Sequence, residues 1–311
     1  SYATPRFYSI RDFPEDYRDL TPSVFYPSPW KGGWWRLRDA VEYCLTGSKA
    51  VLHTAALFRE EFLYGKYKMG KDIMARFAKE PPYAWIIPRE QWDCPTAALL
   101  VERMLMQGIK VFQAEKAFVA DGISYPAGTW VIPMSQPFAL FVKAVFEEML
   151  YPDLTKYPDL WQGVVSPQNF RDAYLPPYDL AGWSLPHQMG VKVMRVDTPL
   201  KASLIEIRKA ELPGAVAERS AGSYLISPKT NNSFAAINRI LKKGAELMRA
   251  KEAFSAGGKS WPAGTFIVPS SKVGREFMAG LAKDLSLEIG AGDPPASAAA
   301  SGKKAFVACE K

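Results

Sequence analysis

The chain has 311 residues, of which 48% are hydrophobic and 23% charged, a composition typical of globular proteins with a substantial core. It contains no apolar run of about eighteen residues, so no membrane-spanning helix is expected. The whole net charge of +7 lies in residues 201–311, where 17 basic and 10 acidic side chains are scattered without interleaved aromatic residues, which argues against nucleic-acid binding. The three cysteines form no C-x-x-C pair and predict neither a disulfide framework nor a thiolate metal site.

The first part of the chain predicts a coil followed by a long helix. Residues 1–33 are rich in Pro, Tyr and Asp and predict irregular structure. From Trp34 to Phe62, apolar residues recur three, four or seven positions apart, which predicts one long helix with a single apolar stripe. A second helix is expected at 71–80. Because a coil and one helix cannot bury such a stripe alone, residues 1–80 are expected to be the end of a domain.

The middle and the end of the chain carry an internal repeat. The stretch "KAFVADGISYPAGTWVIP" at 116–133 returns as "EAFSAGGKSWPAGTFIVP" at 252–269. From Ala117 to Pro133, ten of the seventeen aligned positions are identical. In each copy the stretch follows a predicted strand and a glycine-capped helix and precedes another helix. We therefore expect a mixed α/β domain at 81–290, built from two strand-helix-hairpin-helix units at about 83–150 and 223–290 that superpose.

Turn and cap residues add detail to the repeat. Asp121-Gly122 suits a type I′ hairpin turn, and Tyr125-Pro126-Ala127-Gly128 suits a type I turn with Gly at its fourth position. In the second copy, Ser233 is expected to begin a helix that Gly244 ends. The identical positions hold only residues that turn a chain or fill a core, and none holds a carboxylate, an imidazole or a thiol. The duplication thus predicts architecture, not chemistry.

Residues 151–222 connect the two copies. They begin as a stretch rich in Pro and aromatic residues, and a strand is expected at 191–196. A long irregular segment is either functional or packed on the surface, and the lack of a titratable cluster favours a surface strap. If the segment instead carries a ligand surface, its candidate binding residues are Trp161, Tyr174, Tyr178 and Trp183. Residues 291–311 are expected to be a low-complexity linker and tail.

No catalytic or metal-binding residue is predicted within this chain. Neither His53 nor His187 has a Glu three positions further on, so the H-x-x-E pair of a zinc peptidase is missing. The "GWSLP" stretch around Ser184 is similar to the G-x-S-x-G elbow of hydrolases, but Pro186 takes the place of the second glycine. Cys94 stands before a predicted helix but lacks flanking glycines and a neighbouring His, which favours a partly buried, unreactive thiol.

Several longer stretches carry a family resemblance: "WWRLRDAVEYCLTGSKAVL", "IIPREQWDCPTAALLVERMLMQGIKVFQAEKAF", "YPAGTWVIPMSQPF" and "PPYDLAGWSLPHQMGVKV". Together they resemble the region that follows the peptidase core in long bacterial members of the M14 family of zinc carboxypeptidases. The resemblance covers most of the chain in consistent order. It implies that residues 34–65 correspond to the closing helix of the peptidase fold. The family's zinc ligands and catalytic Glu precede the matched region, so no catalytic position carries over.

The resemblance implies a non-catalytic C-terminal portion of a metallocarboxypeptidase-like protein, with a structural or substrate-positioning role. Its implied partners are the upstream peptidase segment and a peptide substrate. Zinc is expected only in that upstream core, and no cofactor is expected in this chain. The family also implies export to the periplasm or the medium. The alternative that the residues leave open is an independent ligand-binding or structural α/β module without peptidase activity.

Overall fold

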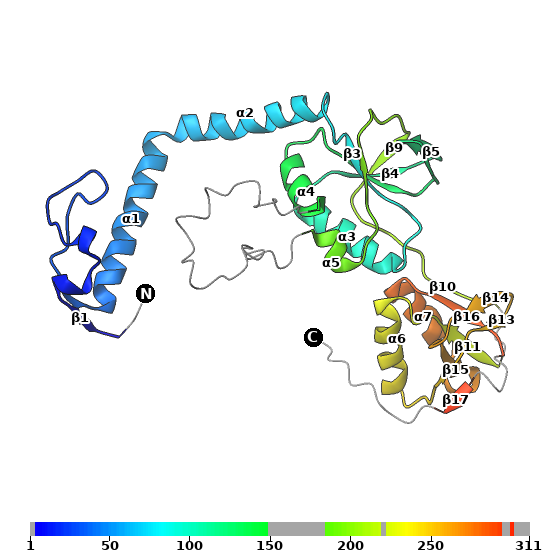
Figure 1. Cartoon of the computed structure of the whole chain (residues 1–311). Helices are drawn as coiled ribbons and strands as arrows, with labels where there is room; N and C mark the ends of the chain where they lie inside the picture. Colours follow the sequence, from blue (N-terminus) through cyan, green and yellow to red (C-terminus); the bar gives the residue numbers. More distant parts are fainter. Residues whose placement is uncertain (1–3, 149–183, 219–221, 294–298, 302–311) are drawn as a thin grey trace, which may run out of the picture. The chain divides into compact units, whose positions relative to one another are not determined.

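The computed structural model describes residues 4–148, 184–218, 222–293 and 299–301 (Figure 1). It confirms the predicted mixed α/β class. The chain divides into two compact units, Ser1–Met69 and Gly70–Lys311, here called the N-terminal unit and the C-terminal unit. Helix α2 begins in the first unit and ends in the second.

The N-terminal unit consists of short elements and one long helix. Its elements are β1 (Arg6–Tyr8), the 3-10 turns η1 (Ile10–Asp12) and η2 (Glu15–Tyr17), β2 (Gly33–Trp35), α1 (Leu37–Leu57) and the first part of α2 (Arg59–Phe77). The single helix expected from Trp34 to Phe62 is wrong at two places. Trp34 lies in β2, where it pairs with Phe7 of β1 and contacts its ring edge-on at 5.7 Å, and Phe58 separates α1 from α2. Cross-strand pairing thus overrides the helical periodicity at the start of the segment.

A chain of aromatic rings holds the coil of the N-terminal unit to the start of α1. Trp30 contacts Tyr8, Phe13 and Trp35 at ring distances of 5.7–6.2 Å, and Trp35 in turn contacts Tyr43 of α1 at 5.6 Å. Such pairs contribute about 0.5–1.5 kcal/mol each beyond the area that they bury. The stretch predicted as irregular coil is therefore tied to the helix through its aromatic residues.

The C-terminal unit contains two α/β lobes, which correspond to the two copies of the repeat. The elements of the first lobe are β3 (Ala84–Ile87), α3 (Cys94–Met106), β4 (Val111–Ala114), β5 (Phe118–Ala120), β6 (Ile123–Tyr125), β7 (Trp130–Pro133), α4 (Ala139–Phe146), α5 (Leu185–Met189), β8 (Met194–Val196) and β9 (Leu204–Ile207). Five of its strands form an antiparallel sheet in the order β8-β3-β7-β4-β9, and β5 pairs with β6 in a separate hairpin. The connecting segment thus supplies two strands to this sheet, of which β8 matches the strand expected at 191–196 and β9 was not predicted.

The second lobe repeats this arrangement. Its elements are β10 (Ala215–Val216), β11 (Ser223–Ile226), α6 (Asn231–Lys242), β12 (Met248–Ala250), β13 (Phe254–Ala256), β14 (Lys259–Trp261), β15 (Phe266–Pro269), the 3-10 turn η5 (Ser270–Lys272), α7 (Arg275–Leu285), β16 (Glu288–Ala291) and β17 (Ala299–Ser301). The sheet order is β10-β16-β11-β15-β12-β17, with β13 and β14 in a separate hairpin. Apart from β10, each strand occupies the place of its counterpart in the first lobe.

The central strand pair has the same register in both lobes. Ala84 of β3 lies opposite Pro133 of β7, and Ser223 of β11 lies opposite Pro269 of β15. Every residue of β3 and of β11 is buried, so both faces of each sheet are covered. This explains why these strands read as continuous apolar runs without alternation.

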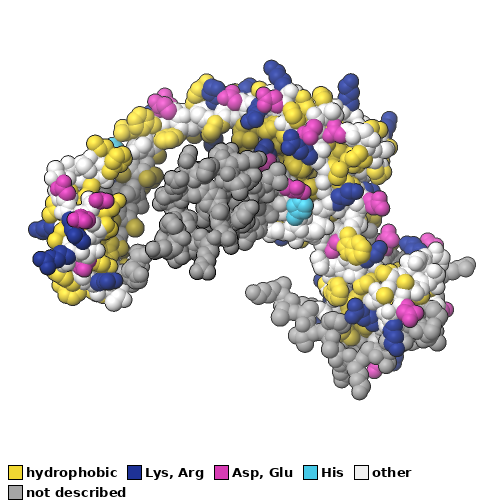
Figure 2. Space-filling model, viewed as in Figure 1, with side chains coloured by type: hydrophobic (Ala, Val, Ile, Leu, Met, Phe, Trp, Pro, Cys, Tyr) yellow, Lys and Arg dark blue, Asp and Glu magenta, His cyan; other side chains and the backbone are white. Residues whose placement is uncertain are grey.

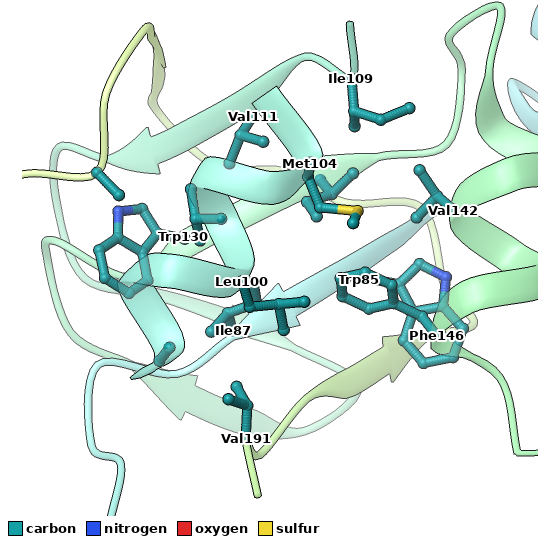
Figure 3. Packing of buried hydrophobic residues seen from close by; sticks show 14 of the residues in the cluster. Trp85, Ile87, Leu100, Met104, Ile109, Val111, Trp130, Val142, Phe146 and Val191 are labelled. Carbon is teal, nitrogen blue, oxygen red and sulfur yellow. The ribbon is translucent and has the colours of Figure 1, made fainter. Parts of the chain in front are cut away.

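Helices cover one face of the first sheet, and the β5–β6 hairpin covers the other. On the helical face, side chains from the strands and from α3 and α4 form one packed cluster that includes Trp85, Ile87, Leu100, Met104, Val111, Trp130, Val142 and Phe146 (Figure 3). On the opposite face, Ile86 and Val131 pack beneath the hairpin, whose Phe118 and Tyr125 rings stack at 5.3 Å. In the second lobe, α6 and α7 cover one face and β13–β14 the other.

Two local expectations need correction. Helix α6 begins after Thr230 instead of Ser233, and the two hydroxyls of these residues lie 2.7 Å apart. The turn after β6 runs from Pro126 to Thr129, whose N–H donates to the Pro126 carbonyl (3.4 Å), because Tyr125 still belongs to β6. Gly128 is therefore the third residue of this turn, where its φ of +83° suits a type II turn and not type I.

Replacing Gly128 or Gly264 with Ala is expected to destabilise the protein by about 1 kcal/mol or more, because both glycines have φ near +85°. A Cβ at Gly128 would lie 2.7 Å from Arg89 Nη1, and one at Gly264 would lie 3.1 Å from Arg249 Nη2. Urea unfolding followed by circular dichroism measures the change. Gly280→Ala is the matched control, because Gly280 lies in α7 with open space around it. This variant should be as stable as the wild type or more stable. Losses below about 0.5 kcal/mol at both turns would contradict the assigned geometry.

Candidate functional site

Helix α1 exposes a row of large apolar side chains. Leu37, Val41, Leu45 and Leu52 recur at helical spacing along it, and their exposed fractions lie between 44% and 70%. We call these four residues the α1 stripe. In a globular protein such a stripe normally faces a core. In this structure none of the residues of α1 is buried, and Figure 2 shows hydrophobic side chains at the surface along the helix.

The side of α1 next to the stripe is polar. Arg38 and Glu42 form an i, i+4 ion pair at 2.5 Å, and Lys49 and His53 follow them on the same side, all exposed. An exposed pair of this kind contributes little to stability, about 0–1 kcal/mol. The helix is therefore amphipathic, with charged side chains beside an apolar stripe that suits a protein neighbour.

The absence of burial extends over the whole described part of the N-terminal unit. Among residues 4–69, no side chain is buried, whereas the C-terminal unit has four clusters of buried hydrophobic residues. Apolar burial is the main favourable contribution to folding, about 25 cal/mol per Å². An uncovered helix face of this extent is the structural feature that most needs a partner.

The candidates for covalent chemistry are not arranged as a nucleophile with its base. Ser184 precedes α5 in a left-handed conformation, and its buried Oγ has no hydrogen-bond partner, so it does not bond to His187 three residues further on. His187 is exposed instead, with Nε2 3.2 Å from Glu148 Oε1. Cys94 is the first residue of α3, and its Sγ faces the carbonyl oxygens of Arg89 (3.7 Å) and Gln91 (4.0 Å).

The four aromatic residues proposed for a ligand surface, Trp161, Tyr174, Tyr178 and Trp183, lie outside the described residues. Within the described ranges, no three His, Cys, Asp or Glu side chains form a group that could hold a metal ion. No helix of that same part of the chain is both long and apolar enough to span a bilayer.

The loop between β3 and α3 joins the two lobes through one carboxylate. Asp93 Oδ1 accepts a hydrogen bond from the Thr96 N–H (2.9 Å) and thereby caps α3, and Oδ2 accepts one from the Asn231 N–H (2.8 Å) at the start of α6. Nearby, the Lys229 ammonium lies 4.9 Å above the Trp92 ring. Two helix N-termini, each with a positive partial charge, thus share one anionic cap.

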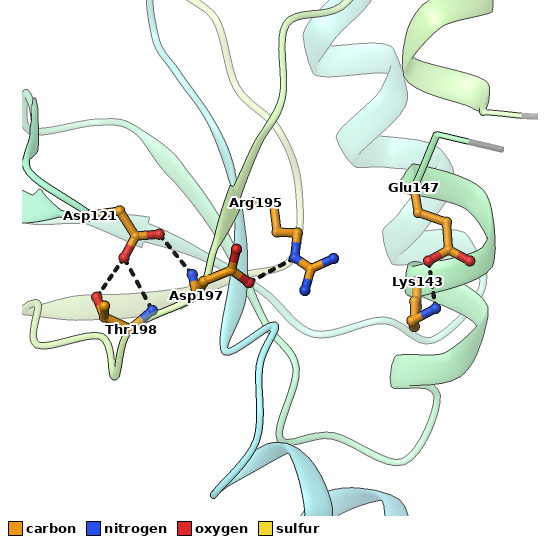
Figure 4. A network of polar contacts seen from close by, with 6 residues as sticks. All are labelled: Asp121, Lys143, Glu147, Arg195, Asp197 and Thr198. Atoms are coloured by element: carbon orange, nitrogen blue, oxygen red, sulfur yellow. Dashed lines mark hydrogen bonds and ion pairs between the residues drawn. The ribbon is translucent and has the colours of Figure 1, made fainter. Parts of the chain in front are cut away.

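The tip of the β5–β6 hairpin is tied to the segment after β8 by a second carboxylate (Figure 4). Asp121, at φ +47°, accepts hydrogen bonds from the Asp197 N–H (2.7 Å), the Thr198 N–H (3.1 Å) and the Thr198 hydroxyl (2.5 Å). The Thr198 side-chain bond, followed by the backbone bonds, lowers the pKa of Asp121 below its usual value. Burial, and then the Asp121 charge, raise the pKa of Tyr125.

Comparisons with protein-family models, with curated proteins and with solved structures found no match for this chain. The class of the protein therefore rests on the architecture: a mixed α/β protein with two lobes that share the order of five strands, and an N-terminal unit that exposes an apolar helix face. The resemblance to the M14 family remains a prediction.

Asp93→Ala is expected to destabilise the C-terminal unit by about 2–3 kcal/mol, because two helix N–H groups lose their partner at once. Asp93→Asn keeps one oxygen acceptor and should lose less. Chemical unfolding of both variants measures the difference. Asp284→Ala is the control, since its ion pair with Arg239 is exposed and long (3.7 Å) and should cost less than about 0.5 kcal/mol. An Asp93→Ala variant as stable as the control would show that the shared cap does not hold the helices.

The stabilising effect of Asp121 should depend on pH. Because its folded-state pKa is lowered, the ionised form stabilises the fold at a pH above the unfolded value of about 3.9, and this contribution disappears as the pH falls through the folded value. Asp121→Asn tolerates the positive φ, removes the charge and keeps one of the two accepting oxygens. We expect the stability gap between wild type and this variant to be constant from about pH 6 to 8 and to shrink below about pH 4. A gap that does not change with pH would contradict the assignment, and Thr198→Val should reduce the gap.

Proposed function

We propose that this chain is the non-catalytic C-terminal portion of an M14-type metallocarboxypeptidase-like protein, and that its N-terminal unit docks against the upstream peptidase core. The uncovered α1 stripe is the observation that carries the proposal. The sequence resemblance supports the proposal independently, because the resemblance aligns residues 34–65 with the closing helix of the peptidase fold.

The energetics of the stripe favour a protein partner. Complete burial of one Leu or Val side chain is worth about 1.5–3 kcal/mol, and the stripe offers four such side chains at regular spacing along one helix. A helix with one apolar face and one charged face fits against the outer layer of an α/β domain. In this arrangement the zinc site and the catalytic carboxylate belong to the upstream core, and this chain supplies none of its residues.

The C-terminal unit would then have a structural or substrate-positioning role. Its two lobes bury their own hydrophobic clusters, and Asp93 links them. These self-contained cores also favour the second candidate function, an independent ligand-binding or structural module without peptidase activity. The upstream sequence separates the two: an H-x-x-E pair before residue 1 in the natural protein supports the first, and a natural start close to Ser1 supports the second.

The 311-residue chain is expected to bind zinc no more tightly than a surface histidine does and to release no C-terminal residue from peptides. The reason is that a zinc peptidase needs three metal ligands and a carboxylate base, and neither histidine of this chain has the paired Glu. A longer protein that includes the upstream segment should gain zinc and activity together. Elemental analysis and a peptide-release assay measure both. Stoichiometric zinc or chelator-sensitive peptidase activity in the 311-residue chain would overturn the proposal.

The docking part of the proposal is tested in the longer protein with stripe variants. Val41→Asp with Leu52→Asp should lower the melting temperature of the peptidase core, because two charges would enter the interface. Val119→Asp is the matched control, since Val119 is exposed on β5. If the stripe double variant melts at the same temperature as the Val119→Asp control, the stripe does not contact the core.

A further inference from the structure

The two lobes of the C-terminal unit differ at one edge of their sheets. In the second lobe, β16 pairs with β11 on one side and with β10 on the other. In the first lobe, β8 takes the place of β16 beside β3, and no strand of the described residues pairs with its outer edge. The segment before β11 forms a strand, whereas the segment before β3 is helix α2, whose Phe77 is buried on the helical face. The first lobe therefore has no counterpart of β10.

The same turn leads into both edge strands, and it identifies the equivalent residues. Val191 follows a left-handed glycine (φ +63°) and donates its N–H to the carbonyl five residues earlier (2.8 Å). Leu287 follows a left-handed serine (φ +52°) and likewise donates its N–H to the carbonyl five residues earlier (2.9 Å). Val191 therefore corresponds to Leu287. Two residues further on, Val193 corresponds to Ile289.

In the second lobe, the carbonyl groups at these two positions hold β10. The Leu287 carbonyl accepts a hydrogen bond from the Ala215 N–H (2.9 Å), and the pairing of the two strands is parallel. The Ile289 carbonyl accepts one from the Ala217 N–H (2.9 Å). The chain also lies tightly against α7 here, because a Cβ on Gly214 would be 1.7 Å from a carbonyl oxygen of that helix. A strand in this place thus needs Gly directly before its first paired residue.

In the first lobe, the corresponding carbonyl groups are open. No hydrogen bond within the described residues reaches the carbonyl of Val191 or of Val193. The backbone of Lys192 between them is bound by the Gln91 side chain, which accepts from its N–H and donates to its carbonyl (both 2.9 Å). Because neighbouring residues of an extended chain direct their backbone groups to opposite edges, Val191 and Val193 direct theirs away from Gln91. This edge offers the same two acceptors that bind β10 in the second lobe.

Charge distinguishes the two edges. The residue of β16 that pairs with Ala215 is Glu288, which also forms an ion pair with Lys259 (3.3 Å). In the first lobe Lys192 takes the position of Glu288, and its side chain is exposed. Opposite charges on neighbouring strands attract, and like charges repel. The edge of the first lobe therefore favours an acidic residue at the place where β10 has Ala215.

We propose that the outer edge of residues 191–196, here called the β8 edge, binds an extended peptide of another protein as a parallel strand. The peptide takes the place that β10 holds in the second lobe, with Gly at the position of Gly214 and an acidic residue at that of Ala215. In such strand addition, backbone hydrogen bonds provide affinity and side-chain positions provide specificity. The inference goes beyond the proposed function and does not depend on a peptidase core.

Fluorescence anisotropy of labelled peptides mixed with the full 311-residue chain tests the proposal. The probe is ELPGEVAE, the sequence of residues 211–218 with Ala215→Glu. It should bind with a dissociation constant below about 1 mM. Methylation of the two peptide nitrogens that correspond to Ala215 and Ala217 should weaken binding at least about 10-fold, because both donors are removed. A probe with Leu in place of its Gly should bind as weakly, since the side chain has no space.

A charge exchange locates the bound peptide. Lys192→Glu should weaken the binding of ELPGEVAE about fivefold or more and should strengthen that of ELPGKVAE, in which Lys takes the acidic position. Lys116→Glu is the matched control, because Lys116 is exposed between β4 and β5 and the variant has the same net charge. Circular dichroism checks that both variants fold.

The outcomes that overturn the proposal are distinct from those of the zinc and peptidase measurements. Absence of saturable binding of ELPGEVAE up to about 1 mM overturns it. Equal binding of the methylated peptide overturns it as well, because the backbone donors would then play no part. So does a Lys192→Glu chain that binds ELPGEVAE as tightly as the Lys116→Glu chain does, because the peptide would then bind elsewhere.

Discussion

The pairing of a completely buried strand with the strand that leaves the hairpin organises each lobe of the C-terminal unit. β3 with β7, and β11 with β15, have the same register, and the first strand of each pair is buried at every residue. Such a strand requires cover on both faces of its sheet. Helices cover one face, and the hairpin folds over the other. The glycine turn after the hairpin is needed because the chain must leave this cover and re-enter the sheet within a few residues.

Outside this shared frame, the two lobes use different residues for equivalent contacts. The first lobe ties its hairpin tip to the segment after β8 with the Asp121 carboxylate. In the second lobe, Gly257 takes the same position in the repeat, and a Cβ there would lie 2.2 Å from the Ala291 carbonyl oxygen, so the backbones approach directly. Likewise, the Trp261 ring fills space that a side chain at Gly290 would need (2.2 Å). The repeat thus preserves the fold while its contacts diverge, and the longer β3–α3 loop of the first lobe adds Asp93, which caps a helix in each lobe.

Apolar surface also dominates the N-terminal unit, but there it is left uncovered. Its aromatic rings attach the coil to α1, but the described residues of this unit bury no side chain. In the proposed function this unit contributes an interaction surface, and no chemical step is assigned to it.

The sequence by itself determined the α/β class, the strands with uninterrupted apolar runs, the hairpins and the amphipathic character of α1, because each depends on residue type and spacing within a short window. It also marked the polar side of α1, where His53 lies exposed. Only the tertiary structure decided the strand order, the addition of β9 to the first sheet, the break at Phe58 and the sharing of Asp93 between two helices. The strand order, the place of β9 and the shared cap join residues as far as 138 positions apart, so no local pattern encodes them. The uncovered stripe belongs to the same group, because exposure depends on which other parts of the chain pack against a residue.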